Sequence, residues 1–153
     1  MSPELDKKRV QEFARKVFGF YTGGVLTLMI ELGYRHGLFE AAAQGAGTSA
    51  ELAGRAGLDE RYVREWLGAM AAGGVIDYDS ATSRFTLPAE HAQCLTGPSS
   101  RNLAPGSQTL RMLATRLPKV SECFRRGGGL RQGHFARSPF SRGRSADGTK
   151  CSS

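Results

Sequence analysis

A capping box followed by two short amphipathic helices is the pattern that most restricts the fold of this 153-residue chain. The Thr48 hydroxyl can accept from the Glu51 amide while the Glu51 carboxylate returns to the Thr48 amide, which predicts a helix start. A tight turn is expected at Gly57, and Asp59 is placed to cap a second helix. The expected inward set of that helix is Tyr62, Val63, Trp66, Leu67 and Met70. Two short helices joined by a turn with glycine predict a helix-turn-helix.

Two segments of alternating apolar and polar residues follow the second helix. They cover residues 75–78 and 84–87, and the polar stretch 79–83 separates them, which predicts a β-hairpin. A helix-turn-helix followed by a two-stranded wing is a winged helix, which we place at residues 48–97. The predicted fold class is therefore mainly α with a small β-hairpin, a winged helix-turn-helix between N-terminal dimerisation helices and C-terminal helices.

Residues 1–47 predict an N-terminal helical dimerisation arm. Apolar residues three and four apart form one helical stripe, made by Val10, Phe13, Ala14, Val17 and Tyr21. This helix is expected to end near Gly23 and Gly24. Residues 25–34 are apolar on nearly all sides, so a helix there must be covered from two directions, by the domain core and by something else. We expect the second cover to come from a homodimer.

The arm contains one carboxylate within an apolar run and a cluster of four aromatic residues. Glu31 lies within the apolar run, where a carboxylate must be paired, hydrogen-bonded or placed at a pocket, and Arg35 is four residues further on. The aromatic cluster is formed by Phe13, Phe18, Phe20 and Tyr21. We interpret this cluster as core rather than as a ligand cage. A ligand cage remains the alternative, because the cluster lies beside a helix that needs a second partner.

The remaining chain divides into a helical segment at residues 98–126 and a basic tail at 127–153. Helical spacing continues through the first, with Pro118 as a break or first-turn residue. The tail carries five basic residues against Asp147, which is +4 of the net charge of +7, and its glycine and serine content predicts disorder. No uninterrupted run of 18 apolar residues is found, so no membrane span is expected. Three widely spaced cysteines predict no disulfide framework and a reducing cytoplasm.

The sequence matches only weakly the motifs typical of cofactor-binding and metal-binding sites. Gly45 and Gly47 fit a dinucleotide fingerprint, but no strand precedes them, so we interpret the segment as a loop entering a capped helix. His91 and Cys94 could share a helical face, but zinc needs at least three protein ligands and none is spaced to join them. The sequence therefore predicts no catalytic, cofactor-binding or metal-binding residues in this chain.

A winged helix raises the question of DNA binding. The basic residues available are Arg61 and Arg64 on the second helix and Arg84 on the wing. They lie among acidic residues, namely Glu60, Glu65, Asp77 and Asp79. This balance gives no clear positive excess for phosphate contacts, so DNA is an unfavoured partner. A winged-helix transcription regulator that uses the three arginines remains the alternative.

Three segments, residues 18–24, 58–67 and 95–103, resemble the N-terminal region of bacterial S-adenosylmethionine-dependent methyltransferases of the mycobacterial winged-helix type. The resemblance runs from about Val10 to Gly129. It implies that the winged helix helps to pair two subunits and closes one side of a pocket for a small-molecule methyl acceptor. It also implies that a following α/β domain binds S-adenosylmethionine.

The resemblance stops near Gly129, before the family's glycine-rich loop, ribose-binding acid and adenine pocket. We therefore hypothesise a truncated or frameshifted methyltransferase that holds no cofactor in this chain and is inactive alone. Four residues are expected to line the acceptor pocket, although no matched motif fixes them: Phe20, Tyr21, Leu110 and Met112.

Overall fold

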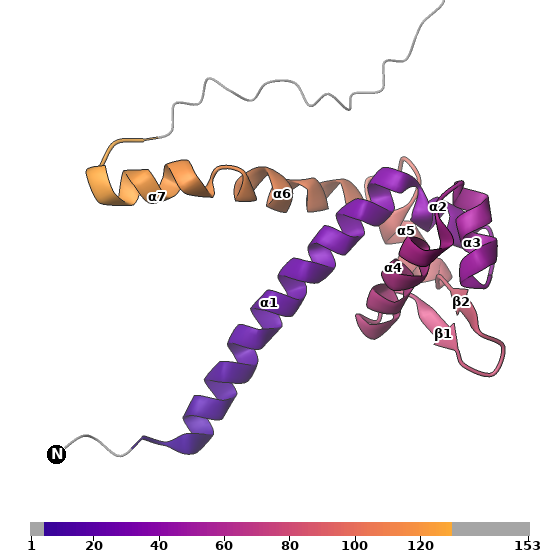
Figure 1. Ribbon diagram of the computed structural model, residues 1–153, viewed down its shortest axis with the longest axis horizontal. Helices are drawn as coiled ribbons and strands as arrows, with labels where there is room; N and C mark the ends of the chain where they lie inside the picture. Colours follow the sequence, from indigo (N-terminus) through magenta and orange to yellow (C-terminus); the bar gives the residue numbers. More distant parts are fainter. Residues whose placement is uncertain (1–4, 130–153) are drawn as a thin grey trace, which may run out of the picture. The chain divides into compact units, whose positions relative to one another are not determined.

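The computed structural model describes residues 5–129 and has the predicted fold class, mainly helical with one two-stranded hairpin (Figure 1). The chain forms two compact units, Met1–Thr115 and Arg116–Ser153. The first holds α1 (Lys7–His36), α2 (Leu38–Ala43), α3 (Ser49–Ala56), α4 (Glu60–Ala72), β1 (Asp77–Asp79), β2 (Arg84–Thr86), α5 (Ala89–Leu95), the 3-10 helix η1 (Ala104–Ser107) and α6 (Gln108–Ala114). The described part of the second unit contains α7 (Leu117–Arg126).

The N-terminal arm is one helix of 30 residues rather than two. The Asp6 side chain caps it by accepting from the amides of Lys8 and Arg9, and Gly37 ends it in the left-handed conformation at φ 69°. The predicted end near Gly23 and Gly24 is wrong. A glycine inside a helix costs only about 1 kcal/mol relative to alanine, so two glycines do not by themselves end a helix.

The helix-turn-helix and its wing agree closely with the sequence-based prediction. Thr48 and Glu51 form the reciprocal capping box, and Gly57 ends α3 in the left-handed conformation. The Asp59 side chain caps α4 by accepting from the Arg61 amide. β1 and β2 pair antiparallel, and Gly47 forms an isolated bridge to Phe85 that adds a short third edge to the wing.

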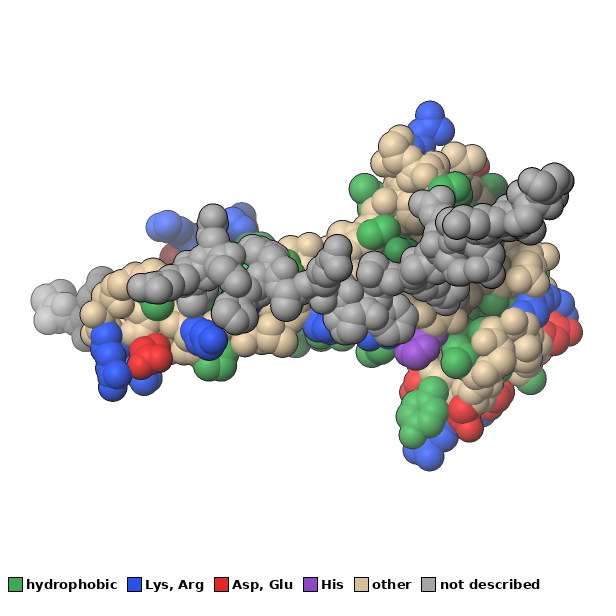
Figure 2. All heavy atoms as spheres, turned by 90° about the horizontal axis from the view of Figure 1, so that it is seen from above, with side chains coloured by type: hydrophobic (Ala, Val, Ile, Leu, Met, Phe, Trp, Pro, Cys, Tyr) green, Lys and Arg blue, Asp and Glu red, His purple; other side chains and the backbone are tan. Residues whose placement is uncertain are grey.

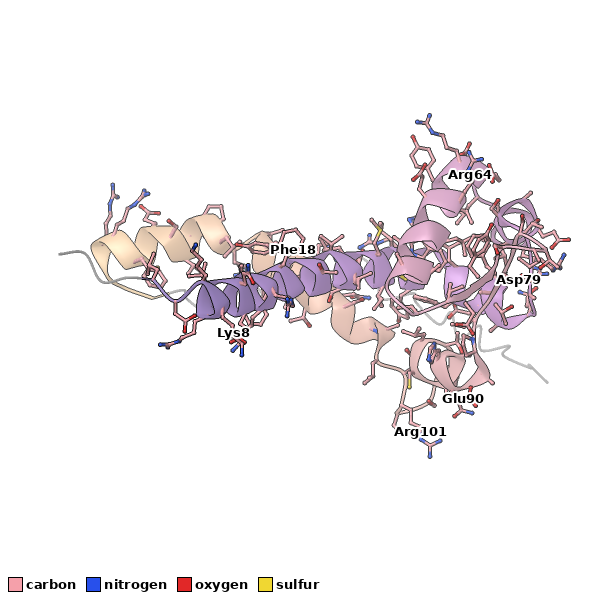
Figure 3. All side chains as sticks on the ribbon, turned by 90° about the horizontal axis from the view of Figure 1, so that it is seen from below. Lys8, Phe18, Arg64, Asp79, Glu90 and Arg101 are labelled. Carbon is pink, nitrogen blue, oxygen red and sulfur yellow. The ribbon has the colours of Figure 1, made fainter. Side chains whose placement is uncertain are left out.

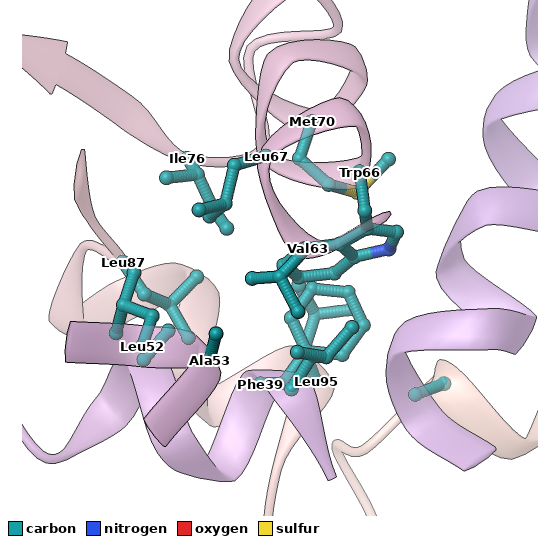
Figure 4. Close-up of a cluster of buried hydrophobic side chains, with 13 residues drawn as sticks. Phe39, Leu52, Ala53, Val63, Trp66, Leu67, Met70, Ile76, Leu87 and Leu95 are labelled. Atoms are coloured by element: carbon teal, nitrogen blue, oxygen red, sulfur yellow. The ribbon is translucent and has the colours of Figure 1, made fainter. Parts of the chain in front are cut away.

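The hydrophobic core lies between α2, α3, α4 and the wing (Figure 4). Phe39 and Trp66 pack edge to face with ring centroids 5.1 Å apart. Four of the five residues predicted to face inward on α4 are buried, namely Val63, Trp66, Leu67 and Met70. Tyr62 is 73% exposed, so its predicted burial is wrong. At 100° per residue it lies about 90° from the centre of the buried face, which places its side chain in solvent.

The C-terminal part of the described chain is helical, as predicted for residues 98–126. η1 buries Ala104 and Ser107, and α6 packs against α1. Pro118 lies in the first turn of α7, where its missing amide hydrogen costs little. The prediction of a disordered basic tail falls largely on residues 130–153, which lie outside the described residues.

Within residues 5–129, α1 is long and apolar enough to cross a membrane by length and composition alone. The sequence shows no uninterrupted apolar run of this length because glycines and threonines separate the larger side chains of the helix. The same helix carries the buried carboxylate of Glu31 and packs Leu26, Met29 and Ile30 against the core. Its C-terminal third is therefore part of a protein core in this structure.

Candidate functional site

The most prominent surface of the described chain is an apolar stripe along α1. Its large side chains are all more than 40% exposed: Val10, Phe13, Phe18, Phe20, Tyr21, Val25, Leu28 and Leu32. At 100° per residue they fall within an arc of about 160° on one side of the helix. Figure 3 shows Phe18 standing out from the middle of α1, with Lys8 near its start. We call these eight residues the α1 stripe.

The expected aromatic core is wrong for this chain. Phe13, Phe18, Phe20 and Tyr21 are between 64% and 72% exposed. They lie in the part of α1 that extends beyond the winged helix, so the described chain offers them little to pack against (Figure 1). Aromatic side chains normally supply the largest gain from burial, so this exposure marks the stripe as a surface for a partner.

Residues 25–34 have two apolar faces, as the sequence predicted. One face carries Leu26, Met29 and Ile30 and packs against the core. The other carries Val25, Leu28 and Leu32, which are 41–55% exposed. The domain core therefore covers one side of the helix, and the second side is open to a further cover.

Glu31 lies at the edge between these two faces and is 4% exposed. Its Oε1 atom accepts hydrogen bonds from the guanidinium of Arg35, one turn on, and from Nε of Arg111 on α6 at 3.2 Å. The hydrogen bond from Arg35 lowers the pKa of Glu31, burial opposes that change, and the charges of Arg35 and Arg111 lower it further. The predicted Glu31–Arg35 pair is confirmed, and sequence spacing gave no signal for Arg111, which lies 80 residues away.

The predicted pocket residues come from two places on the first unit. Phe20 and Tyr21 lie on the α1 stripe, 64% and 67% exposed. Leu110 and Met112 flank Arg111 on α6, and Met112 is 38% exposed. Arg111 of α6 contacts α1 at Glu31. Phe20 lies 11 residues before Glu31, roughly 16 Å away along the helix axis. The common pocket remains a prediction, and another surface would have to close it.

Two of the three arginines proposed for DNA binding have acidic partners. Arg84 lies 2.9 Å from the Glu51 carboxylate and also donates to the Ala46 carbonyl. Arg64 lies 3.8 Å from the Glu60 carboxylate on α4, and Arg61 is exposed. On the face seen in Figure 2, basic and acidic side chains are interspersed over the winged helix.

The glycine loop that resembled a dinucleotide fingerprint has a structural role. Arg55 donates to the carbonyls of Gly45 and Ala46, at 2.5 and 3.1 Å. The Gly47 amide donates to Phe85, and the Phe85 amide returns to Gly47 at 2.8 Å. The loop thus turns carbonyl oxygens toward a guanidinium and joins the wing, which agrees with our interpretation of it as a loop before a capped helix.

One hollow on the winged helix was not anticipated from the sequence. It has a volume of about 430 Å³ and is lined by Ala43, Leu87, Ala89, Ala92, Gln93, Thr96 and Ser99. Six of these residues lie within residues 87–99 and Ala43 comes from α2. Most of the side chains are small and none is ionisable, so they formed no motif that could indicate the hollow. Nearby, Nδ1 of His91 is hydrogen-bonded to the Val75 carbonyl at 2.9 Å, which accounts for one ring nitrogen of the His91–Cys94 pair.

A helix-turn-helix, a two-stranded wing and a long preceding helix docked on the second helix define a winged-helix domain. Residues 24–97 match the model of the family described as "Rv2258c-like winged HTH domain", so a winged HTH domain is present in this part of the chain. No curated protein matches the chain. The family model begins within α1, so it treats the docked end of this helix as part of the domain.

Several solved structures share the fold. "PigF with SAH" has a TM-score of 0.62 and 20% identity, over 80% of this chain and 34% of that one. An O-methyltransferase family protein from Burkholderia thailandensis has a TM-score of 0.57 and 20% identity, over 80% and 34%. Human N-acetylserotonin methyltransferase in complex with SAM has a TM-score of 0.62 and 12% identity, over 85% and 38%. This chain therefore spans about a third of the length of these structures.

Proposed function

We propose that this chain is the dimerising, pocket-forming N-terminal region of an S-adenosylmethionine-dependent methyltransferase. The observation that carries the proposal is the α1 stripe, which is apolar, wide and exposed beside a winged helix whose arginines are partly neutralised. Two solved structures of similar fold are described as methyltransferases, the human one in complex with SAM, and a third is described as "PigF with SAH". An apolar surface of this size fits a protein partner or an apolar substrate better than it fits DNA.

Sedimentation of the purified chain tests the dimer. We expect dimers at micromolar concentration, and a monomer after Tyr21→Glu, because the substitution places a charge at the middle of the α1 stripe. Thr22→Glu is the matched control, since Thr22 lies about 100° away on the helix and should leave the dimer intact. A stable monomer for the unchanged chain would contradict the proposal.

We also propose that the described residues hold no methyl-donor site of their own, so the chain is inactive alone. The α/β domain of the family would bind the methyl donor. The small-molecule acceptor would bind in a pocket that this region closes on one side. Calorimetric titration with S-adenosylmethionine should give no saturable heat, whereas micromolar binding would show a site within this chain.

The DNA-binding alternative has a direct test. A regulator using Arg61, Arg64 and Arg84 should retain sequence-specific binding near physiological ionic strength. We expect only weak binding that disappears as salt is raised, because Arg64 and Arg84 are already ion-paired. A salt-resistant specific complex, lost on Arg61→Ala, would favour the regulator.

We propose a cytoplasmic location for this region. Cys94 and Cys123 are unpaired and Cys94 is exposed, an arrangement suited to a reducing compartment. Cell fractionation should recover the chain with the soluble proteins. Recovery with membranes that resists carbonate extraction would show instead that α1 inserts into lipid.

A further inference from the structure

The α1 stripe is organised around a seam with coiled-coil spacing. Val10, Val17, Tyr21, Gly24 and Leu28 are separated by seven, four, three and four residues, which keeps them on one line of a supercoiled helix. Phe18, Val25 and Leu32 flank this line on one side at intervals of seven, and Phe13 and Phe20 flank it on the other. A side chain at Gly24 would meet no atom within 4 Å, so the described chain leaves the middle of the seam open.

The length of the seam indicates what covers it. From Val10 to Leu32 the stripe extends over 23 residues, roughly 33 Å along the helix axis. Among the described elements, α4 is the next longest helix at 13 residues, and its apolar face is already buried. α1, with 30 residues, is the described element whose length matches the stripe. A second copy of α1 is therefore the fitting occupant.

Charge decides the orientation of that second copy. Residues 6–16 at the start of α1 carry five basic and two acidic residues, a net charge of +3. The winged helix at residues 48–97 carries four arginines and seven acidic residues, a net charge of −3. Parallel helices would bring the two basic ends together, whereas antiparallel helices bring each basic end toward the partner's acidic domain. Antiparallel pairing also aligns the helix dipoles favourably.

We propose that two copies pair through an antiparallel α1–α1 contact whose two-fold axis passes near Tyr21. Tyr21 is the midpoint between Val10 and Leu32, so Val10 of one copy lies opposite Leu32 of the other. The contact is isologous, with the same surface used by both copies, and it closes as a dimer. This inference rests on the proposed function, because it specifies the partner of the dimerisation arm.

Disulfide trapping tests the orientation. The background replaces Cys94, Cys123 and Cys151 by serine, and three single variants are made: Val10→Cys, Tyr21→Cys and Leu32→Cys. After mild oxidation, Tyr21→Cys should form covalent dimers alone. Val10→Cys and Leu32→Cys should remain monomeric alone on a denaturing gel and form covalent dimers when mixed, with at least ten times the yield of either alone.

The outcomes separate the orientation from the dimer itself. Cross-linking of Val10→Cys with itself would overturn the antiparallel arrangement while leaving a dimer. A dimer by sedimentation that gives none of the expected cross-links would overturn the register. A monomer by sedimentation would contradict both this inference and the proposed function, and binding of that monomer to phosphatidylglycerol vesicles would identify lipid as the occupant of the α1 stripe.

Discussion

The indole Nε1–H of Trp66 donates a hydrogen bond to the main-chain carbonyl of Met29 at 2.8 Å. The bond joins α4 of the helix-turn-helix to the docked end of α1. Trp66 is 5% exposed, and its ring also packs edge to face on Phe39. The arm is therefore fixed to the domain near its C-terminal end by a buried polar contact, while the α1 stripe runs along its exposed side from Val10 to Leu32.

Trp66→Phe should lower the free energy of unfolding by about 1–3 kcal/mol, because it removes this hydrogen bond and leaves unfilled space in the core. Urea unfolding followed by circular dichroism, at one fixed protein concentration, measures the change. Tyr62→Phe is the control on the same helix, since Tyr62 is 73% exposed and should change stability by less than about 0.5 kcal/mol. Equal effects of the two variants would show that Trp66 does not anchor the arm.

Two glycines of α1 should respond oppositely to alanine. A Cβ on Gly33 would lie 2.5 Å from Trp66 and 2.7 Å from Phe39, both in the core, so Gly33→Ala should destabilise the fold by about 1–3 kcal/mol. A Cβ on Gly23 would meet nothing within 4 Å, so Gly23→Ala should stabilise it by up to about 1 kcal/mol through helix propensity. Thermal unfolding of both variants checks the signs, and a stabilising Gly33→Ala would contradict the close packing of α1 on the core.

Local signals were sufficient to predict the winged helix. The capping box at Thr48 and Glu51, the turn at Gly57 and the cap at Asp59 each depend on residues within four positions of one another. The Glu31–Arg35 pair is local in the same way, one helical turn apart. Interactions of this kind are encoded in short sequence windows, so they can be predicted without knowledge of the tertiary structure.

The errors arose where distant parts of the chain decide the outcome. The two glycines after Thr22 were interpreted as a helix end, but the single helix persists because its far end is docked through Met29 on Trp66. The contact of Arg111 with Glu31 spans 80 residues and has no sequence signature. The exposure of Phe18 and Tyr21 could not be distinguished from burial, because an apolar stripe looks the same whether the same chain or a partner covers it.

Arg55→Lys should loosen the loop that precedes α3. The guanidinium of Arg55 donates to the carbonyls of Ala41 and Gly45 from Nη1 and to the carbonyl of Ala46 from Nη2, whereas lysine would offer one nitrogen in place of two. We expect a loss of about 1 kcal/mol in stability and faster hydrogen exchange at the Phe85 amide, which donates to Gly47 in the same loop. Arg61→Lys, on exposed α4 surface, is the control. Unchanged exchange at Phe85 in Arg55→Lys would show that the loop holds without the guanidinium.

Glu31→Gln should destabilise the fold in a pH-dependent way. The pKa of Glu31 is lowered from 4.5 in the folded chain, first by the hydrogen bond from Arg35 and then by the charges of Arg35 and Arg111, against the opposing effect of burial. A carboxylate with a lowered pKa stabilises the fold above its unfolded pKa, and this contribution is lost as the pH falls through the folded pKa. At pH 7 the variant should therefore be less stable by about 1–3 kcal/mol, since it removes the buried negative charge that Arg35 and Arg111 both contact.

The difference between the unchanged chain and Glu31→Gln should shrink as the pH is lowered below 4.5, because a protonated Glu31 then resembles glutamine. Urea unfolding at pH 7, 5 and 3.5 measures it. Glu122→Gln is the control: its carboxylate pairs with Arg126 at the surface of α7, where a single ion pair contributes less than about 0.5 kcal/mol at any pH. A difference for Glu31→Gln that stays constant from pH 7 to 3.5 would mean that the amide disturbs packing and that the ionised carboxylate does not hold α6 against α1.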